Sequence, residues 1–128
     1  MRILLDTHTF IWFAEDDVQL DQTIKGTIEK STNDIYLSIA SIWEMAIKMQ
    51  LKKLKIDKSI EDVIDLVTLN GIELLPILPD HIIKMTTLDF YHRDPFDRII
   101  IAQGLVENFK IVSRDKIFDK YGVDRLWK

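Results

Sequence analysis

Ile3-Leu4-Leu5-Asp6 is a run of three apolar residues that ends in an acid. A short continuous apolar run, without alternating polar residues, is typical of a strand buried on both faces of a parallel sheet. Similar runs recur at 35–37, 72–75 and 111–112, and 125–127 is a further short candidate. The sequence therefore predicts a parallel sheet of four to five strands.

Segments with apolar residues at helical spacing separate these strand candidates. They are a short helix around 10–13 and longer helices over about 20–30, 38–51, 60–70, 80–88 and 95–109. Strands that alternate with helices are typical of an α/β domain, in which helices cover both faces of a parallel sheet. We therefore expect a single domain over 1–128, a length that suits one hydrophobic core.

Charge and composition exclude several classes of protein. Lys and Arg total 17 and Asp and Glu total 21, a net charge of −4, which argues against a broadly basic nucleic-acid surface and leaves a local basic patch open. Without cysteine the chain has no disulfide or thiolate zinc site, and with three histidines a metal would bind mainly oxygen. Because no apolar run reaches the roughly 18 residues that span a bilayer, and the N-terminal run is too short for a secretory signal, we expect a cytoplasmic protein without a membrane segment.

Four acidic residues occupy comparable places near the ends of the strand candidates. Asp6 ends the first strand, and Asp115 lies just beyond the fourth. Glu44 lies early in the helix after the second strand, and Asp97 lies in the first turn of the helix from Pro95. The carboxyl ends of parallel strands share one edge of the sheet, so the four carboxylates should converge there.

Converging carboxylates repel one another unless a cation lies between them. Mg²⁺ and Mn²⁺ suit sites made only of oxygen ligands. Such an ion activates a bound water or bridges the attacking and leaving oxygens in a displacement at phosphorus. The pattern therefore predicts a metal site and favours phosphodiester hydrolysis.

Each acid also has a purely structural interpretation. Asp6 could cap the following helix, a role open to Thr7 as well, and Asp115 could initiate a turn. Ser41 and Glu44 match the Ser-x-x-Glu capping box, so Glu44 could simply hold a helix start. Four acids that all lie where strands end are less readily explained in this way.

Asp94 and Asp97 need to be told apart, because both lie in one short motif. Pro95 favours the first position of a helix, which makes Asp94 the N-cap. Asp97 then falls in the first turn, where the positive end of the helix dipole should keep its carboxylate ionised. We therefore expect Asp97 to be the ligand and Asp94 the cap.

The chain resembles the PIN-domain family, and within it the VapC-type toxins of bacterial toxin–antitoxin pairs. The resemblance covers nearly the whole chain, and its motifs are specific in their order and spacing rather than singly. They are Ile3-Leu4-Leu5-Asp6-Thr7-His8, Ser38-Ile39-Ala40-Ser41-Ile42-Trp43-Glu44, His92-Arg93-Asp94-Pro95-Phe96-Asp97-Arg98, Ile101-Ala102-Gln103, and Val112-Ser113-Arg114-Asp115 with Phe118 and Tyr121-Gly122-Val123.

The resemblance implies a PIN domain over 1–128 that cleaves RNA with a divalent metal, leaving a 5′-phosphate and a 3′-hydroxyl. The family's acidic quartet falls on Asp6, Glu44, Asp97 and Asp115. We expect Asp6, Asp97 and Asp115 to hold Mg²⁺ or Mn²⁺, and Glu44 to join them or orient the attacking water. Supporting positions are Thr7 and Ser113, which orient carboxylates or serve as plain caps, and Asp94.

RNA needs cations beside such an acidic pocket. The candidates are Arg93, Arg98, Arg114 and Lys48, with Lys52, Lys53 and Lys55 beyond them. His8 and His92 flank the motifs, and a surface or packing role is commoner for such residues than a phosphate contact. We expect Phe10, Trp12 and Phe13 to pack in the core or face a partner.

The family also implies partners beyond RNA: a cognate antitoxin and a second copy in a homodimer. We expect the antitoxin's C-terminal segment to cover the groove, with Phe10, Trp12 and the helix from Ser38 as apolar anchors. The alternative is a catalytically silent PIN-fold binding module. A phosphoacceptor receiver domain is disfavoured, because Asp6 stands alone and the third strand candidate ends without an Asp.

Overall fold

The computed structural model describes residues 1–127. They form one five-stranded sheet of order β3-β2-β1-β4-β5 in which every neighbouring pair is parallel. The strands are β1 (Arg2–Leu5), β2 (Asp34–Ser38), β3 (Glu73–Leu75), β4 (Lys110–Val112) and β5 (Asp124–Leu126). β1 lies at the centre, which explains why Ile3, Leu4 and Leu5 are fully buried. The predicted α/β fold is confirmed.

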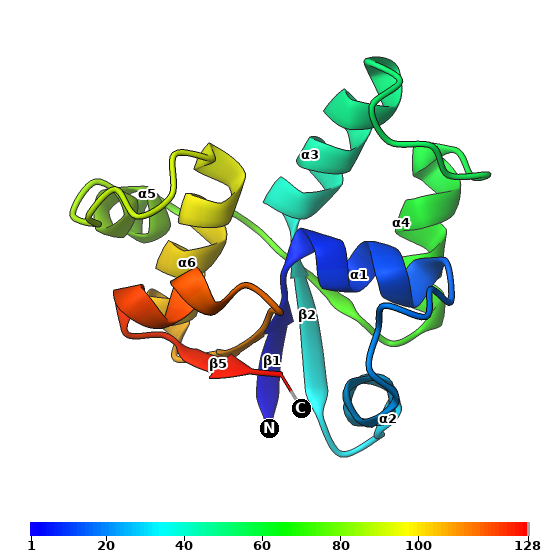
Figure 1. Cartoon of the computed structure of the whole chain (residues 1–128), viewed down its shortest axis with the longest axis horizontal. Helices are drawn as coiled ribbons and strands as arrows, with labels where there is room; N and C mark the ends of the chain where they lie inside the picture. The colour runs from blue at the N-terminus through cyan, green and yellow to red at the C-terminus, as the bar shows by residue number, and fades with distance from the viewer. Residues whose placement is uncertain (128) are drawn as a thin grey trace.

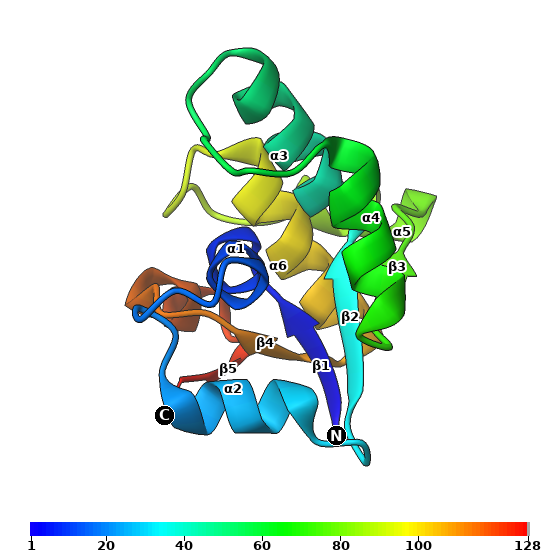
Figure 2. The same ribbon diagram turned by 90° about the vertical axis from the view of Figure 1, so that its right-hand side faces the viewer.

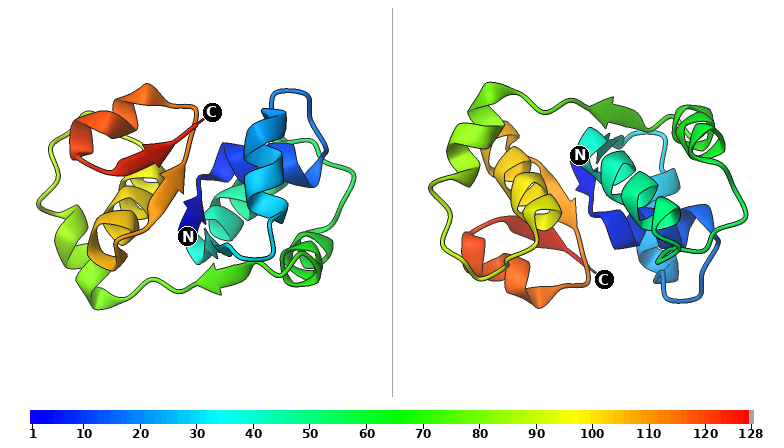
Figure 3. Two further views of the ribbon diagram at one scale, coloured as in Figure 1. Left: turned by 90° about the horizontal axis from the view of Figure 1, so that it is seen from below. Right: turned by 90° about the horizontal axis from the view of Figure 1, so that it is seen from above.

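Helices cover both faces of the sheet (Figures 1 and 2). They are α1 (Thr7–Ala14), α2 (Gln22–Glu29), α3 (Ile39–Gln50), α4 (Ile60–Leu69), α5 (Pro79–Met85) and α6 (Pro95–Glu107), with a 3-10 helix η1 (Lys116–Tyr121). Figure 3 shows α5 and α6 on one side and α2 and α4 on the other. Alternate side chains of β1 enter separate cores, Ile3 and Leu5 on the α2–α4 side and Leu4 on the α6 side.

The capping residues of two helices decide between the alternatives that the sequence left open. α3 begins at Ile39, because the Ser38 hydroxyl at the end of β2 accepts a bond of 3.0 Å from the N–H of Ala40. Glu44 therefore lies inside the helix, and its capping-box interpretation is wrong. α1 is capped by Asp6 and not by Thr7, since an Asp6 carboxylate oxygen accepts a bond of 2.8 Å from the N–H of Thr9.

Other elements are shorter than predicted or were not predicted at all. α5 ends at Met85, and η1 had no sequence signal, because six residues are too few for an apolar period. The α6 start at Pro95 with Asp94 as N-cap is confirmed, and α6 ends where Asn108 adopts a left-handed conformation. Within residues 1–127 no helix is long and apolar enough to cross a membrane.

Candidate functional site

Asp6 enters the site because it directly follows the central strand. The Asp6 N–H donates a bond of 3.1 Å to the carbonyl of Val112, so β1 and β4 end side by side. The Asp6 side chain is 6% exposed, and this burial raises its pKa. Hydrogen bonding from the Thr9 and Ser113 side chains lowers the pKa and offsets part of that rise. Ser113, at the end of β4, thus supports Asp6.

Thr7 has a different role from the one expected of it. Its hydroxyl donates a bond of 2.9 Å to the Ser41 hydroxyl, and both side chains are buried. Thr7 therefore joins α1 to α3. The expectation that it orients a carboxylate or caps α1 is wrong, because its donor is used between the two helices.

Glu44 projects from α3 and is 2% exposed. Its Oε2 lies 2.7 Å from the ammonium of Lys48, one turn further along the helix. Its Oε1 is buried and finds no hydrogen-bond partner within residues 1–127. A buried charged oxygen without a donor is costly, so this atom is suited to accept a ligand's proton or a cation.

Asp97 has a strongly raised pKa. Burial raises its pKa to about 7, and the carboxylates of Asp94, Glu44 and Asp6 act in the same direction. Sequence reasoning that the helix dipole keeps Asp97 ionised is wrong for the protein without a cation, because burial and three like charges outweigh the dipole. Asp94 itself caps α6, accepting bonds of 2.8 and 3.2 Å from the N–H groups of Phe96 and Asp97.

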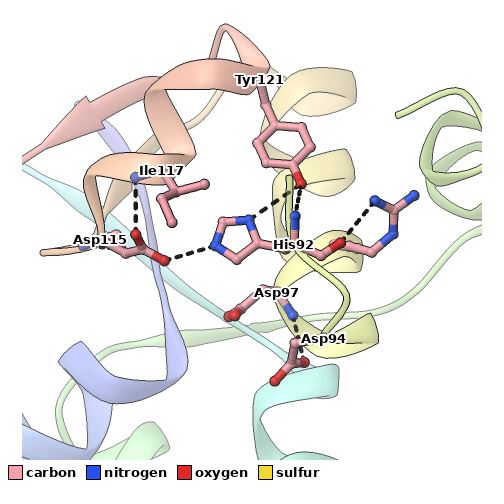
Figure 4. A network of polar contacts seen from close by, with 8 residues as sticks. His92, Asp94, Asp97, Asp115, Ile117 and Tyr121 are labelled. Atoms are coloured by element: carbon pink, nitrogen blue, oxygen red, sulfur yellow. Dashed lines mark hydrogen bonds and ion pairs between the residues drawn. The ribbon is translucent and has the colours of Figure 1, made fainter. Parts of the chain in front are cut away.

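Asp115 is held differently from the other three acids (Figure 4). Its Oδ1 accepts a bond of 3.0 Å from the N–H of Ile117 and caps η1, so its structural interpretation also holds. Its Oδ2 lies 2.8 Å from Nε2 of His92. With Asp6 it lines a pocket of about 280 Å³, whose other walls are His8, Trp12 and Arg114.

The acids in and around this pocket have a chemistry that suits a hard divalent cation. Asp6 and Asp115 line the pocket itself. Beyond its lining, Glu44 has an unpaired oxygen, and the carboxylates of Asp94, Glu44 and Asp6 repel Asp97. We refer to these five acids together as the acidic pocket. As the side chains lie, no three acidic or histidine residues of 1–127 are close enough together to hold one ion. Bridging waters, which Mg²⁺ retains in most sites, or small side-chain rotations are therefore required.

The predicted RNA contacts separate into distinct groups. The prediction that Arg98 contacts RNA is wrong, because this residue is only 6% exposed. Its guanidinium donates hydrogen bonds of 2.9–3.4 Å to the backbone carbonyls of Met85, Leu88, Asp89 and His92. Lys48 pairs with Glu44, so its ammonium already has a partner. Arg93 and Arg114 are exposed, and the Arg114 guanidinium lies 5.4 Å from the ring centre of Trp12.

Aromatic residues also divide between the core and the surface. Phe10 is fully buried, so the expectation that it anchors a partner is wrong. Trp12 is partly buried against Trp127, and Trp43 on α3 is 59% exposed. Trp43 also lines an apolar pocket of about 250 Å³ between α3, α5 and α6, beside Phe96 and Ile82.

His92 and His81 are the residues that sequence reasoning underrated. His92 contacts Asp115 and Tyr121, and the packing role expected of it is confirmed. Its place directly before the Arg93-Asp94-Pro95 motif was the available signal. His81 is fully buried between α5 and α6, far in sequence from its partners Gln103 and Glu107, so no local pattern indicated it.

Comparisons with known proteins agree with this geometry. The profile of the family described as "PIN domain" matches residues 3–124. Among solved structures, VapBC2 from Rickettsia felis bound to a promoter DNA fragment has a TM-score of 0.74 at 14% identity, with 98% of both chains covered. FitAcB from Neisseria gonorrhoeae has a TM-score of 0.68 at 19% sequence identity. A toxin–antitoxin complex from Klebsiella pneumoniae has a TM-score of 0.63 at 15% sequence identity. Each of these matches covers 98% of this chain and 96% of the other. These identities show a shared fold, and a search of curated proteins finds no match.

Proposed function

The chain belongs to the PIN domain family, and from this membership and its acidic pocket we propose that it is a metal-dependent endoribonuclease, the toxin of a toxin–antitoxin pair. One observation carries the nuclease proposal. Burial raises the pKa of Asp97 to about 7, with the carboxylates of Asp94, Glu44 and Asp6 acting in the same direction, and Glu44 keeps a buried oxygen without a partner within residues 1–127. Such perturbed, clustered acids are typical of sites where a ligand supplies the missing charge.

In this proposal Asp6, Asp97 and Asp115 hold Mg²⁺ or Mn²⁺. When bound, such an ion would supply Lewis-acid chemistry, making a water molecule more acidic and offsetting negative charge at the phosphate. The unpaired Oε1 of Glu44 accepts a hydrogen bond from the attacking water and orients it. Burial of Asp6 and Glu44 excludes bulk water from the inner wall of the pocket, which strengthens these interactions.

RNA approaches through the wall formed by His8, Trp12 and Arg114. Arg114 is exposed there and offers a forked cation to a phosphate, while the Trp12 and His8 rings lie with centres 6.0 Å apart. An aromatic face beside an arginine suits one unstacked base and its phosphate. Arg114 therefore stays a candidate for substrate contact, Trp12 is added to it, Arg98 is withdrawn, and Arg93 stays a prediction.

Cleavage of total RNA tests the nuclease proposal. Activity should disappear in EDTA and return when Mg²⁺ or Mn²⁺ is added in excess. Full cleavage in EDTA, or none with either metal, would contradict it.

An antitoxin partner is supported by the solved structures of similar fold, which include toxin–antitoxin complexes. We expect its C-terminal segment to cover the acidic groove, with Trp12 and exposed residues of α3 such as Trp43 as apolar anchors. Co-expression should relieve growth arrest, and the purified complex should cleave RNA far more slowly than the free chain. An unchanged nuclease rate in the complex would count against this partner.

We also expect a homodimer, as the family resemblance implies. The apolar pocket by Trp43 and Ile82, with Ile83 exposed beside it on α5, offers an apolar surface to a second copy. Sedimentation equilibrium should give twice the chain mass, and Ile82→Glu should shift it toward the monomer. The alternative function, a catalytically silent binding module, requires a folded chain that binds no divalent ion.

A further inference from the structure

We propose that His92, oriented by Tyr121, is the positioning residue that holds the Asp115 carboxylate in place within the acidic pocket. This inference rests on the proposed function, because it assigns a role toward the proposed metal ligand Asp115. His92 lies at the centre of a polar network that joins two separate parts of the chain, the segment before α6 and η1 (Figure 4).

The Asp115 carboxylate decides which ring nitrogen of His92 donates toward it. A carboxylate oxygen only accepts, so Nε2 of His92, 2.8 Å from Oδ2 of Asp115, carries a hydrogen. The backbone N–H of His92 donates a bond of 2.6 Å to the phenol oxygen of Tyr121. Nδ1 of His92 lies 3.3 Å from the same oxygen, and in the tautomer with its hydrogen on Nε2 it accepts from the Tyr121 hydroxyl.

Nε2 then donates to Oδ2 of Asp115 at 2.8 Å. The other oxygen of this carboxylate accepts from the N–H of Ile117 at 3.0 Å. One donor on each oxygen fixes the plane of the carboxylate. Carboxylates that ligate metals commonly have such partners, and loss of one weakens metal binding.

Packing prevents the His92 ring from turning away. The ring stacks on Tyr121 with centres 5.6 Å apart and contacts the edge of Phe118 at 5.2 Å. Its side chain is only 10% exposed. Because the ring is enclosed and Nε2 is already paired, His92 has no nitrogen to offer to an RNA phosphate.

The segment that carries His92 is itself held to α6. The Arg98 guanidinium donates to the carbonyl oxygens of Asp89 at 2.9 Å and His92 at 3.4 Å. α6 also carries Asp97, so one buried arginine and one histidine set the position of Asp115 relative to Asp97. This explains why Arg98 is buried.

Four single variants test the proposal. His92→Phe keeps an aromatic ring between Tyr121 and Phe118 but removes the donor to Asp115, whereas His92→Gln returns an N–H donor. Tyr121→Phe removes the hydroxyl that orients His92. Tyr91→Phe is the matched control, since the Tyr91 ring packs edge-on against Tyr121 at 5.1 Å and its hydroxyl makes no hydrogen bond within residues 1–127.

Mn²⁺ affinity by calorimetry is the main readout, with kcat/KM for RNA cleavage and thermal melting alongside. We expect His92→Phe to weaken Mn²⁺ binding about 10- to 100-fold. His92→Gln should recover part of the lost Mn²⁺ affinity. Tyr121→Phe should bind Mn²⁺ several-fold more weakly than the wild type, and Tyr91→Phe should bind it with wild-type affinity. Melting temperatures of the three His92 and Tyr121 variants should not follow this order, because packing and positioning are separate effects.

The proposal is overturned if His92→Phe binds Mn²⁺ as tightly as the wild type while Asp97→Asn does not, an outcome that leaves the proposed function intact. A wild type that binds no Mn²⁺ overturns both. If His92→Phe does not fold, the Tyr121→Phe and Tyr91→Phe pair decides: equal Mn²⁺ affinities in these two variants would overturn the proposal.

Discussion

The acidic pocket and a cluster around His81 both bury polar side chains, yet they balance charge in different ways. In the cluster, Nδ1 of His81 accepts a bond of 3.0 Å from the N–H of Leu78, and Nε2 lies 3.3 Å from the Glu107 carboxylate. Gln103 donates a bond of 3.2 Å to the carbonyl of Pro76. Within residues 1–127 each region leaves one buried side-chain oxygen without a partner, on Gln103 and on Glu44.

The difference lies in the neighbours of those two oxygens. Gln103 is neutral, and the one acid in its cluster faces a histidine. The Glu44 carboxylate pairs with Lys48, and together with the carboxylates of Asp94 and Asp6 it acts to raise the pKa of Asp97. We therefore expect accumulated like charge, and not buried polarity alone, to mark the functional site of this molecule.

Asp97→Asn gives the largest expected effect. The amide keeps the shape of the side chain but removes the charge that a hard cation needs, so RNA cleavage should fall at least about a thousandfold, about 4 kcal/mol of transition-state stabilisation. The variant should fold at least as well as the wild type, because repulsion with Asp94 and Glu44 is relieved. The measurement is cleavage of total RNA in Mg²⁺, with thermal melts.

Asp94→Asn is the matched control for that variant. Asn caps helices about as well as Asp, so stability should change little and activity should stay within about tenfold of the wild type. If Asp94→Asn does not cleave RNA while Asp97→Asn remains active, Asp94 is the metal ligand and the assignment of Asp97 to that role is wrong.

His81→Ala should produce the opposite pattern. It leaves a cavity between α5 and α6 and unpairs the N–H of Leu78, so the free energy of unfolding should fall by about 3 kcal/mol. Urea denaturation measures this loss. The rate of RNA cleavage per folded molecule should remain at the wild-type value, and a folded but inactive variant would show that the His81 cluster belongs to the site.

The pH dependence of stability is the smallest expected effect. Without metal, the pKa of Asp97 rises from 3.8 in the unfolded chain to about 7, so the wild type loses stability as pH rises between these values. The Asn side chain of Asp97→Asn does not titrate. Relative to the wild type, the free energy of unfolding of this variant should therefore rise by about 1–2 kcal/mol between pH 4 and pH 8, allowing for partial exposure. Melts of both proteins in EDTA measure the difference, and a constant difference across this range would show that Asp97 is not buried among like charges.

The sequence sufficed for the inner strands β1, β2 and β4, because their apolar residues are buried within the sheet, and shorter apolar stretches indicated the edge strands β3 and β5. Asp94 and Pro95 likewise located the start of α6. The start of α3 was predicted to within one residue, and Ser38 is both the last residue of β2 and the cap of α3. These features could be predicted because residues adjacent in the sequence determine them.

Predictions failed where distant parts of the chain meet. The sequence around Arg98 predicted a phosphate contact, but its guanidinium donates hydrogen bonds to backbone carbonyls of the preceding segment. The specific partners of His92, which are Asp115 and Tyr121, lie 23 and 29 residues away and could not be predicted from its neighbours in sequence. The raised pKa of Asp97 likewise depends first on its burial and then on nearby carboxylates, including Glu44 on α3 and Asp6 after β1.

Calorimetric titration of Mn²⁺ at pH 8 tests most directly whether the acidic pocket, and not buried polarity in general, is the functional site. Wild type and His81→Ala, measured at a temperature where both are folded, should bind Mn²⁺ with similar affinity, and Asp97→Asn should bind at least about a hundredfold more weakly. Equal heats from wild type and Asp97→Asn, or no binding by the folded wild type, would contradict this assignment.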